Sequence, residues 1–281
     1  MMFKRILLSF FLIVLIISNT YAQTNYAVDN NLLPKNFNNQ SITKIISLSP
    51  EITELIYELD AQDLLKGVDI NSNYPVEAQN LPKVADYFNI YNEKVIKIKP
   101  DLIIGTKSYN ISIINHQKYL KDKTLLLDFS SKDNFKKSIL TLGKVINKEE
   151  RAQEIINTIE NETQKQQLKY QNSNVKPVVL IIWSKPISII GRDSLINDLI
   201  KDCQSYNYFA NEKINYFTIN IEKLISIKDK VKFINLGVNP FNPNSIKVSN
   251  IDKELSDIMN RATLRTITKG LPKLCDIIQN K

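Results

Sequence analysis

The stretch IISLSPEITELIYEL, residues 45–59, decides the fold class of the chain. Its apolar start around Ile45 and Ile46 is typical of a short buried strand, and the Ser-Pro-Glu turn that follows suits the first turn of a helix, where proline is favoured. Apolar residues then recur at helical spacing, at Ile52, Leu55, Ile56 and Leu59. A strand that runs through a turn into an amphipathic helix opens an α/β domain, and this turn lacks the glycines of a phosphate-binding loop.

The N-terminus predicts export. Lys4 and Arg5 precede an apolar stretch at residues 6–17, and Thr20-Tyr21-Ala22 supplies the small-residue pattern of a cleavage site. Residues 1–22 are therefore predicted to be a signal peptide and the protein to be periplasmic. The alternative is an uncleaved anchor helix, although about 12 apolar residues fall short of the roughly 20 that span a bilayer.

Composition narrows the class of partner. The pI is about 9.2, but 32 of the 37 basic residues are lysines spread along the chain, so we expect a solvated lysine-rich surface and no nucleic-acid partner. The two cysteines, Cys203 and Cys275, belong to a chain predicted to be exported, where a disulfide can form and persist. A Cys203–Cys275 disulfide is predicted, with two buried free thiols as the alternative.

The order of apolar segments predicts two α/β lobes. After a loose leader at residues 23–42, short runs at 45–46, 64–68, 102–104 and 125–127 alternate with helical patterns, as in a parallel sheet with crossover helices. Residues 148–170 contain neither proline nor glycine and place Ala152, Ile155, Ile156, Ile159 and Thr163 on one side of a single long helix. A second α/β pattern follows. We expect an N-terminal lobe at 43–147, a rigid linking helix at 148–171, a C-terminal lobe at 172–281, and a ligand cleft between the lobes.

The chain carries few signals of catalysis. Its single histidine, His116, lies in a polar helical pattern and is interpreted as a surface residue, and one histidine cannot build a histidine-rich metal site. A secreted hydrolase with Ser49 or Ser184 as nucleophile would need a Gly-x-Ser-x-Gly elbow and a base, and the sequence lacks the elbow. We therefore expect a protein that is not an enzyme and uses no cofactor or metal. An adhesive or structural envelope protein stays open as another class.

Aromatic residues gather in segments that follow predicted strands: Tyr74 in NSNYP, Tyr87 and Phe88 in ADYFN, Trp183 in IIWSKP, and Tyr216 and Phe217 in INYFTIN. Each alone fits ordinary packing. Together they suit a pre-formed cleft that holds a large planar ligand between aromatic faces.

Residues 44–105, with Ser-Leu-Ser-Pro, Tyr-Pro, Leu-Pro-Lys-Val and Lys-Pro-Asp-Leu in order, resemble the class III periplasmic substrate-binding proteins of ABC importers, and among them the carriers of vitamin B12. The resemblance thins in the second lobe, where CQSYNYF, NIEKLISIKDK and NRATLR keep the order and spacing. It implies two lobes bridged by a rigid helix, a monomer, and cobalamin or another corrinoid as the ligand, with an iron-siderophore or haem as the alternative.

The resemblance also implies site residues. Tyr74, Tyr87 or Phe88, Trp183 or its neighbour Ile182, and Tyr216 match aromatic ligand contacts, and Arg261 matches an arginine at the polar rim. The sequence departs from the pattern at Thr106 and Lys107, where a tryptophan is expected and Tyr109 could fill in. For a siderophore, the residues that would face the anion are Lys107, Arg192, Arg261 and Arg265. Glu93 and Glu222 match exposed glutamates, one on each lobe, that dock on the importer's membrane subunits.

Overall fold

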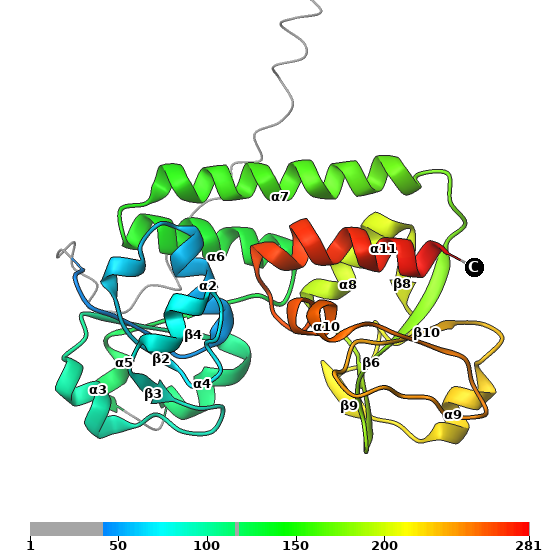
Figure 1. Ribbon diagram of the computed structural model, residues 1–281, viewed down its shortest axis with the longest axis horizontal. Coiled ribbons are helices and arrows are strands. Elements are labelled where there is room, and N and C mark those ends of the chain that lie inside the picture. The colour runs from blue at the N-terminus through cyan, green and yellow to red at the C-terminus, as the bar shows by residue number, and fades with distance from the viewer. Residues whose placement is uncertain (1–41, 116–117, 281) are drawn as a thin grey trace, which may run out of the picture.

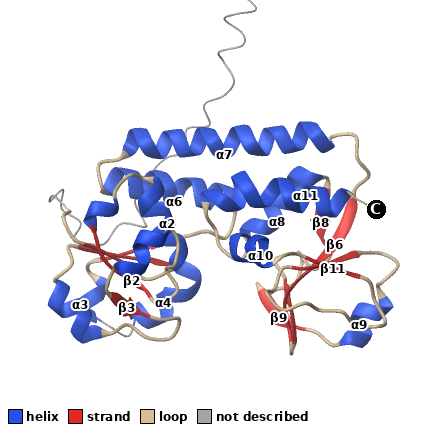
Figure 2. Cartoon of the chain, in the orientation of Figure 1, coloured by secondary structure: helices blue, strands red, loops and turns tan. Residues whose placement is uncertain are grey.

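The structure is a computed structural model that describes residues 42–115 and 118–280. Two α/β lobes lie side by side, and the long helix α7 (Glu149–Tyr170) spans both of them along one side of the molecule (Figure 1). Each lobe has its own sheet, with helices around it (Figure 2). The predicted fold class is confirmed. The predicted signal peptide, nearly all of the leader, and His116 lie outside the described residues.

The first lobe contains a five-stranded sheet in the order β3-β2-β1-β4-β5, and every neighbouring pair is parallel. Its strands are β1 (Ile45–Ser47), β2 (Leu65–Asp69), β3 (Lys83–Ala85), β4 (Leu102–Thr106) and β5 (Thr124–Leu127). Its helices are α2 (Pro50–Glu58), α3 (Asn92–Ile98), α4 (Lys107–Asn115), α5 (Lys118–Lys121) and α6 (Lys132–Val145). The chain order reverses direction across the sheet between β1 and β4, and α/β proteins bind ligands at such a switch point, outside the carboxyl ends of the strands.

The second lobe contains a mixed sheet in the order β11-β10-β6-β7-β9, with β8 paired to β6. Its strands are β6 (Lys176–Ser184), β7 (Ile187–Ile190), β8 (Ser205–Asn207), β9 (Tyr216–Thr218), β10 (Lys232–Asn235) and β11 (Val248–Asn250). Its helices are α8 (Leu195–Leu199), α9 (Ile221–Ser226), α10 (Lys253–Met259) and α11 (Leu271–Gln279). The pairs β6·β7 and β7·β9 are antiparallel, and the chain passes through α8 and β8 between β7 and β9, so this edge of the sheet is antiparallel.

Helix α7 joins the two lobes into one core. The five residues predicted to share a side of this helix are all buried, together with Gln166 and Tyr170. One apolar cluster runs from Ile45 of β1 through Ile155 of α7 to Leu180 of β6. Because the lobes share packed side chains along α7, large hinge motion would have to break apolar contacts. Helix α6, capped by Ser131 whose hydroxyl accepts from the Asn134 N–H at 3.2 Å, packs beside α7 and was not predicted from the sequence.

The predicted disulfide is present. Cys203, at the end of a 3₁₀ turn after α8, bonds to Cys275 of α11, with 72 residues of separation in sequence and both residues fully buried. The bond ties the C-terminal helix to the body of the second lobe. In the part of the chain that the structure describes, no helix is long and apolar enough to cross a membrane.

Candidate functional site: a cavity between the lobes

A cavity of about 1060 Å³ lies between the two lobes. The N-terminal lobe lines it with residues that follow four parallel strands: Ser49 and Glu51 after β1, Asp69 at the end of β2, Tyr109 after β4, and Asp128 after β5. These are the carboxyl ends of the strands beside the switch point, where backbone loops project side chains into a crevice. The C-terminal lobe contributes both apolar or aromatic residues and polar ones: the first set includes Ile182, Trp183, Ile190, Leu195, Ile196, Tyr216, Phe217 and Met259, and the second includes Asp193, Ser194, Lys253, Asp257, Asn260 and Arg261.

The sequence places the start of helix α2 at the cavity. Ser47 donates its hydroxyl to the Ser49 carbonyl at 2.8 Å, and the Thr53 hydroxyl lies 2.9 Å from that of Ser47, so the turn is fixed from beneath. Pro50 occupies the first helical turn. Ser49 does not cap the helix with its side chain, and its buried Oγ has no hydrogen-bond partner among the described residues. Both Ser49 and Glu51 line the cavity.

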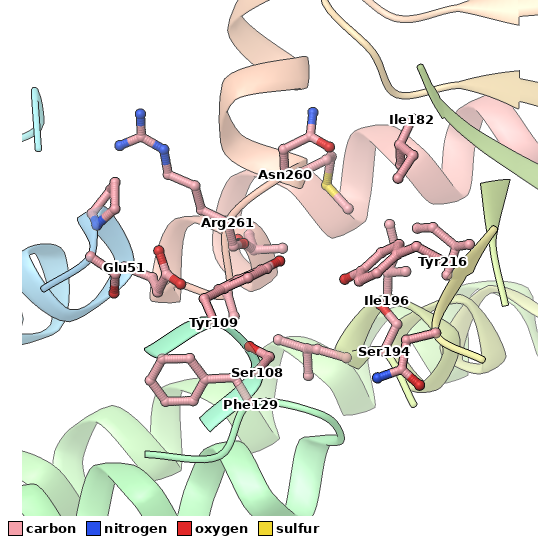
Figure 3. A pocket seen from close by; sticks show the side chains of 18 of the residues that line it. Glu51, Ser108, Tyr109, Phe129, Ile182, Ser194, Ile196, Tyr216, Asn260 and Arg261 are labelled. Atoms are coloured by element: carbon pink, nitrogen blue, oxygen red, sulfur yellow. The ribbon is translucent and has the colours of Figure 1, made fainter. Parts of the chain in front are cut away.

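Among the described residues, six aromatic side chains line the cavity: Tyr87, Tyr109 and Phe129 from the first lobe, and Trp183, Tyr216 and Phe217 from the second. The rings of Tyr87 and Tyr109 are 5.5 Å apart between centroids. Tyr109 of the first lobe and Tyr216 of the second point toward each other across the cavity (Figure 3). The Trp183 indole N–H donates to the Lys185 carbonyl at 2.8 Å, which holds the ring at the tip of the β6–β7 hairpin.

Two of the aromatic residues expected at the site, Tyr74 and Phe88, are not among the residues that line this cavity. The Arg265 guanidinium lies over the Tyr74 ring, 3.7 Å from its centroid. Phe88 is 76% exposed and meets the edge of Tyr87, with 4.9 Å between ring centroids. The structure therefore brings Tyr87, Trp183 and Tyr216 together and leaves Tyr74 in contact with a buried ion pair.

Arg261, expected at the polar rim, lines the cavity but directs its guanidinium into an ion-pair network between the lobes. It donates to Glu54 of α2 at 3.0 Å, to Asp257 of α10 at 2.8 Å and to Asn73 at 2.9 Å. Arg265 makes a bidentate pair with the same Glu54, at 2.8 and 2.7 Å. Glu54 is 2% exposed, so this network joins the lobes behind the cavity and out of water.

The cavity is acidic. Five carboxylates line it, those of Glu51, Asp69, Asp128, Asp193 and Asp257, against the cations Lys253 and Arg261. Burial raises the pKa of Glu51 to about 7, although its own backbone N–H and Arg261 oppose this shift. Burial also raises the pKa of Asp69 above its usual range. Burial, with Tyr216 and Glu51 nearby, raises the pKa of Tyr109, so its phenol stays protonated at neutral pH.

The cations that would face an anionic siderophore already have acidic partners. Lys107 lies 3.4 Å from Asp128, and Arg192 lies 3.1 Å from Asp193. Arg261 and Arg265 are paired with Glu54 as described. An anionic ligand would have to compete with these carboxylates for each lysine or arginine side chain.

Glu93 and Glu222 are exposed, and each lies in the first turn of a short helix, α3 in one lobe and α9 in the other. Helices α3 and α9 lie at the side of the molecule opposite to α7, one on each lobe (Figure 1).

The sequence argument overlooked Glu51 and Asp257 as cavity residues. Glu51 follows a proline in the first turn of a helix, where acidic residues are common, so the sequence carries no signal of its burial. Asp257 lies four residues before Arg261, a helical spacing that allows the observed ion pair.

Comparison with known proteins places the chain in a family. A family model described as "Periplasmic binding protein" matches residues 45–264. An uncharacterized ABC transporter substrate-binding lipoprotein of Bacillus subtilis is 29% identical over 188 residues, which are 62% of this chain and 60% of that protein. The vitamin B12-binding protein of Vibrio parahaemolyticus is 26% identical over 198 residues, covering 69% of this chain and 71% of that protein.

Solved structures share the fold. The periplasmic vitamin B12-binding protein of Vibrio cholerae superposes with a TM-score of 0.73 at 21% identity, covering 85% of this chain and 99% of that one. The structure of S. aureus IsdE complexed with haem superposes with a TM-score of 0.71 at 20% identity, covering 84% of this chain and 98% of that one. At such identities the likeness concerns the fold alone. The relatives are substrate-binding proteins and not enzymes, as the sequence predicted, and the chain belongs to the periplasmic binding protein family.

Proposed function

We propose that this protein is a periplasmic carrier that captures cobalamin or a related corrinoid and delivers it to an ABC importer. The observation that carries the proposal is the pair of aromatic walls: Tyr87 and Tyr109 on one side and Trp183 and Tyr216 on the other, around a cavity of about 1060 Å³. Such a volume is at the upper end of small-molecule pockets, and ring faces suit a large planar macrocycle. The names of the relatives that bind vitamin B12 support the same ligand.

The direct test is a titration of the mature protein with cyanocobalamin in which the heat of binding is measured by calorimetry. We expect a dissociation constant in the micromolar range or below. Combining Trp183→Ala with Tyr216→Ala should weaken binding by roughly 1 to 3 kcal/mol through lost aromatic burial. Phe88→Ala is the matched control, because Phe88 is aromatic and near Tyr87 but does not line the cavity. Binding of haem or a ferric siderophore with none of cyanocobalamin would contradict the corrinoid assignment.

The alternative is a haem or iron-siderophore carrier. It is favoured by one feature, the two phenols of Tyr109 and Tyr216 that face each other in the cavity and could approach a ring-bound iron. Two features oppose it: the acidic lining, and the raised pKa of Tyr109, which disfavours the phenolate that ferric iron would require.

Export and docking complete the proposal. Residues 1–22 act as a cleaved signal peptide, the segments 43–147, 148–171 and 172–281 act as lobe, linking helix and lobe, and the carrier works as a monomer. Glu93 and Glu222 contact cationic residues of the importer's membrane subunits, and two separated charges fix the orientation of the cleft above the pore.

Charge reversal tests the docking step. Glu93→Lys with Glu222→Lys should leave ligand affinity unchanged and abolish stimulation of the importer's ATPase, because like charges across an interface cost several kcal/mol. Glu150→Lys is the control: Glu150 is also an exposed first-turn glutamate, but it lies on α7 at the opposite side of the molecule. Full ATPase stimulation by the double variant would refute the docking roles.

A further inference from the structure

Two polar residues at the start of helix α2, Ser49 and Glu51, are among the residues that line the cavity. Ser49 is 5% exposed, and its Oγ is buried without a hydrogen-bond partner among the described residues. Because that Oγ has almost no accessible surface, the polar side-chain group that a ligand can reach at this turn is the Glu51 carboxyl. Glu51, two residues on, is 8% exposed, and its carboxyl accepts from its own backbone N–H.

The charges around this pair disfavour an anion. The groups that act on Glu51 come from four places: Glu54 of the same helix, Asp69 at the end of β2, Arg261 after α10, and Tyr109 of α4. The only cation among them, Arg261, donates to Glu54 and Asp257. In Figure 3 the Arg261 guanidinium points away from the space between Tyr109 and Tyr216. A ligand carboxylate placed beside Glu51 would therefore meet acceptors and negative charge in a site of low dielectric.

We propose that Glu51 forms a subsite that binds an uncharged hydrogen-bonding group of the ligand, a primary amide, and rejects a carboxylate. An amide fits because its N–H₂ donates to the Glu51 carboxylate, whereas an ionised carboxylate has no hydrogen to donate. The inference rests on the proposed function and deepens it, since it assigns the ligand to amide-rimmed macrocycles and excludes carboxylate-rimmed ones.

The subsite also makes selection depend on pH. The pKa of Glu51 is raised to about 7, so the carboxyl is mainly ionised at pH 8 and mainly neutral at pH 6. Ionised Glu51 repels a ligand carboxylate, whereas neutral Glu51 can donate a hydrogen bond to it. Discrimination between amide and carboxylate ligands is therefore stronger at pH 8 than at pH 6.

Matched ligand pairs test the proposal on two frameworks. The corrin pair is dicyanocobinamide, with primary amides on the ring, and dicyanocobyrinic acid, with carboxylates. The porphyrin pair is haem and its bis-amide. At pH 8 the amide member of whichever pair is bound should bind at least about tenfold more tightly than the carboxylate member. Glu51→Gln should reduce this ratio to about threefold or less, mainly by tightening the carboxylate ligand.

Controls separate this inference from the proposed function. Glu58→Gln, on the same helix but away from the cavity, should keep the wild-type ratio of amide to carboxylate affinity. In the unmodified protein the same ratio should fall from pH 8 to pH 6, and this test does not depend on the folding of any variant. Equal binding of the two corrinoids would overturn the subsite and leave the corrinoid function intact. If the protein bound no corrinoid but bound the haem bis-amide more tightly than haem, the corrinoid function would be overturned and the subsite would stand. A protein that binds none of the four ligands would overturn both.

Discussion

The two walls of the cavity differ in construction. The first lobe offers loop residues at the carboxyl ends of a fully parallel sheet, and these include Glu51 and Asp69. The second lobe offers an antiparallel sheet edge, with Trp183 and Tyr216, beside polar residues near α10 that include Asp257. Loops can place single polar groups, whereas a sheet edge presents area. We infer that the antiparallel edge supplies contact area for any large planar ligand, and that the loops at the ends of the parallel strands select among such ligands.

The largest effect expected concerns the disulfide, which belongs to the second lobe alone. Replacing both Cys203 and Cys275 by alanine should lower the free energy of unfolding by about 4 kcal/mol, because the bond closes a long loop in the unfolded chain. The single tryptophan, Trp183, lies in this lobe, so its fluorescence reports the second lobe, while far-UV circular dichroism reports both. Since the lobes share a core, we expect both signals to shift together in urea. Separate transitions would show that the lobes unfold independently.

The next prediction concerns the ion pairs that join the walls. Glu54→Ala leaves Arg265, 10% exposed at its side chain, without its bidentate partner and should destabilise the protein by about 3 kcal/mol. We expect the low end of the range that is usual for loss of one partner of a buried ion pair, because Asp257 remains 3.6 Å from Arg265. Glu154→Ala, which removes a pair with the half-exposed Arg151 at 2.8 Å, is the control and should cost less than about 1 kcal/mol. Equal losses in the two variants would mean that Glu54 does not hold the lobes together.

An effect of similar size, which depends on pH, concerns Glu51 in the first wall. Because the pKa of Glu51 is raised from 4.5 to about 7 in the folded protein, its folded form binds a proton more tightly than its unfolded form. The resulting stability is fully present below pH 4.5 and is lost as the pH rises through 7. Glu51→Gln, which stays neutral, should therefore exceed the wild type in stability by about 3 kcal/mol at pH 8 and match it near pH 4. A pH-independent difference would show that burial of the charge is not the cause.

Sequence patterns predicted those parts of the molecule that periodicity and composition control. The strands at 45–46, 102–104 and 125–127 and the helix at 148–170 are long or strongly apolar, and each is present within one or two residues. The disulfide followed from two cysteines in a chain predicted to be exported. Three-residue strands such as β9 (Tyr216–Thr218), with mostly exposed side chains, carry no periodic signal, so the antiparallel edge of the second sheet could not be predicted.

The candidate site was only partly predictable, because its electrostatics depend on contacts between distant residues. Tyr87, Trp183 and Tyr216, which the resemblance named, line the cavity, and their role in ligand binding stays a prediction. Arg265 and Glu54 are 211 positions apart, and no local pattern reveals their pairing. That pairing also explains why Tyr74 lies against Arg265. The burial of Glu51, and with it the raised pKa, follows from the way the two lobes enclose the start of α2.

The smallest expected effect lies where the two walls meet, at Tyr109 and Tyr216. These phenols interact across the cavity, since a hydrogen bond with Tyr216 contributes to the raised pKa of Tyr109. Tyr109→Phe and Tyr216→Phe each keep the ring and remove one hydroxyl, so a double-mutant cycle on the ligand-free protein isolates the contact between them. A hydroxyl pair of this kind should give a coupling energy of about 0.5 to 1 kcal/mol. The cycle of Tyr87→Phe with Tyr216→Phe is the control and should give a coupling near zero, because Tyr87 contacts Tyr109 through its ring. A coupling near zero for Tyr109 and Tyr216 as well would mean that the walls do not touch without ligand, so the closing of the cavity would then depend on the ligand itself.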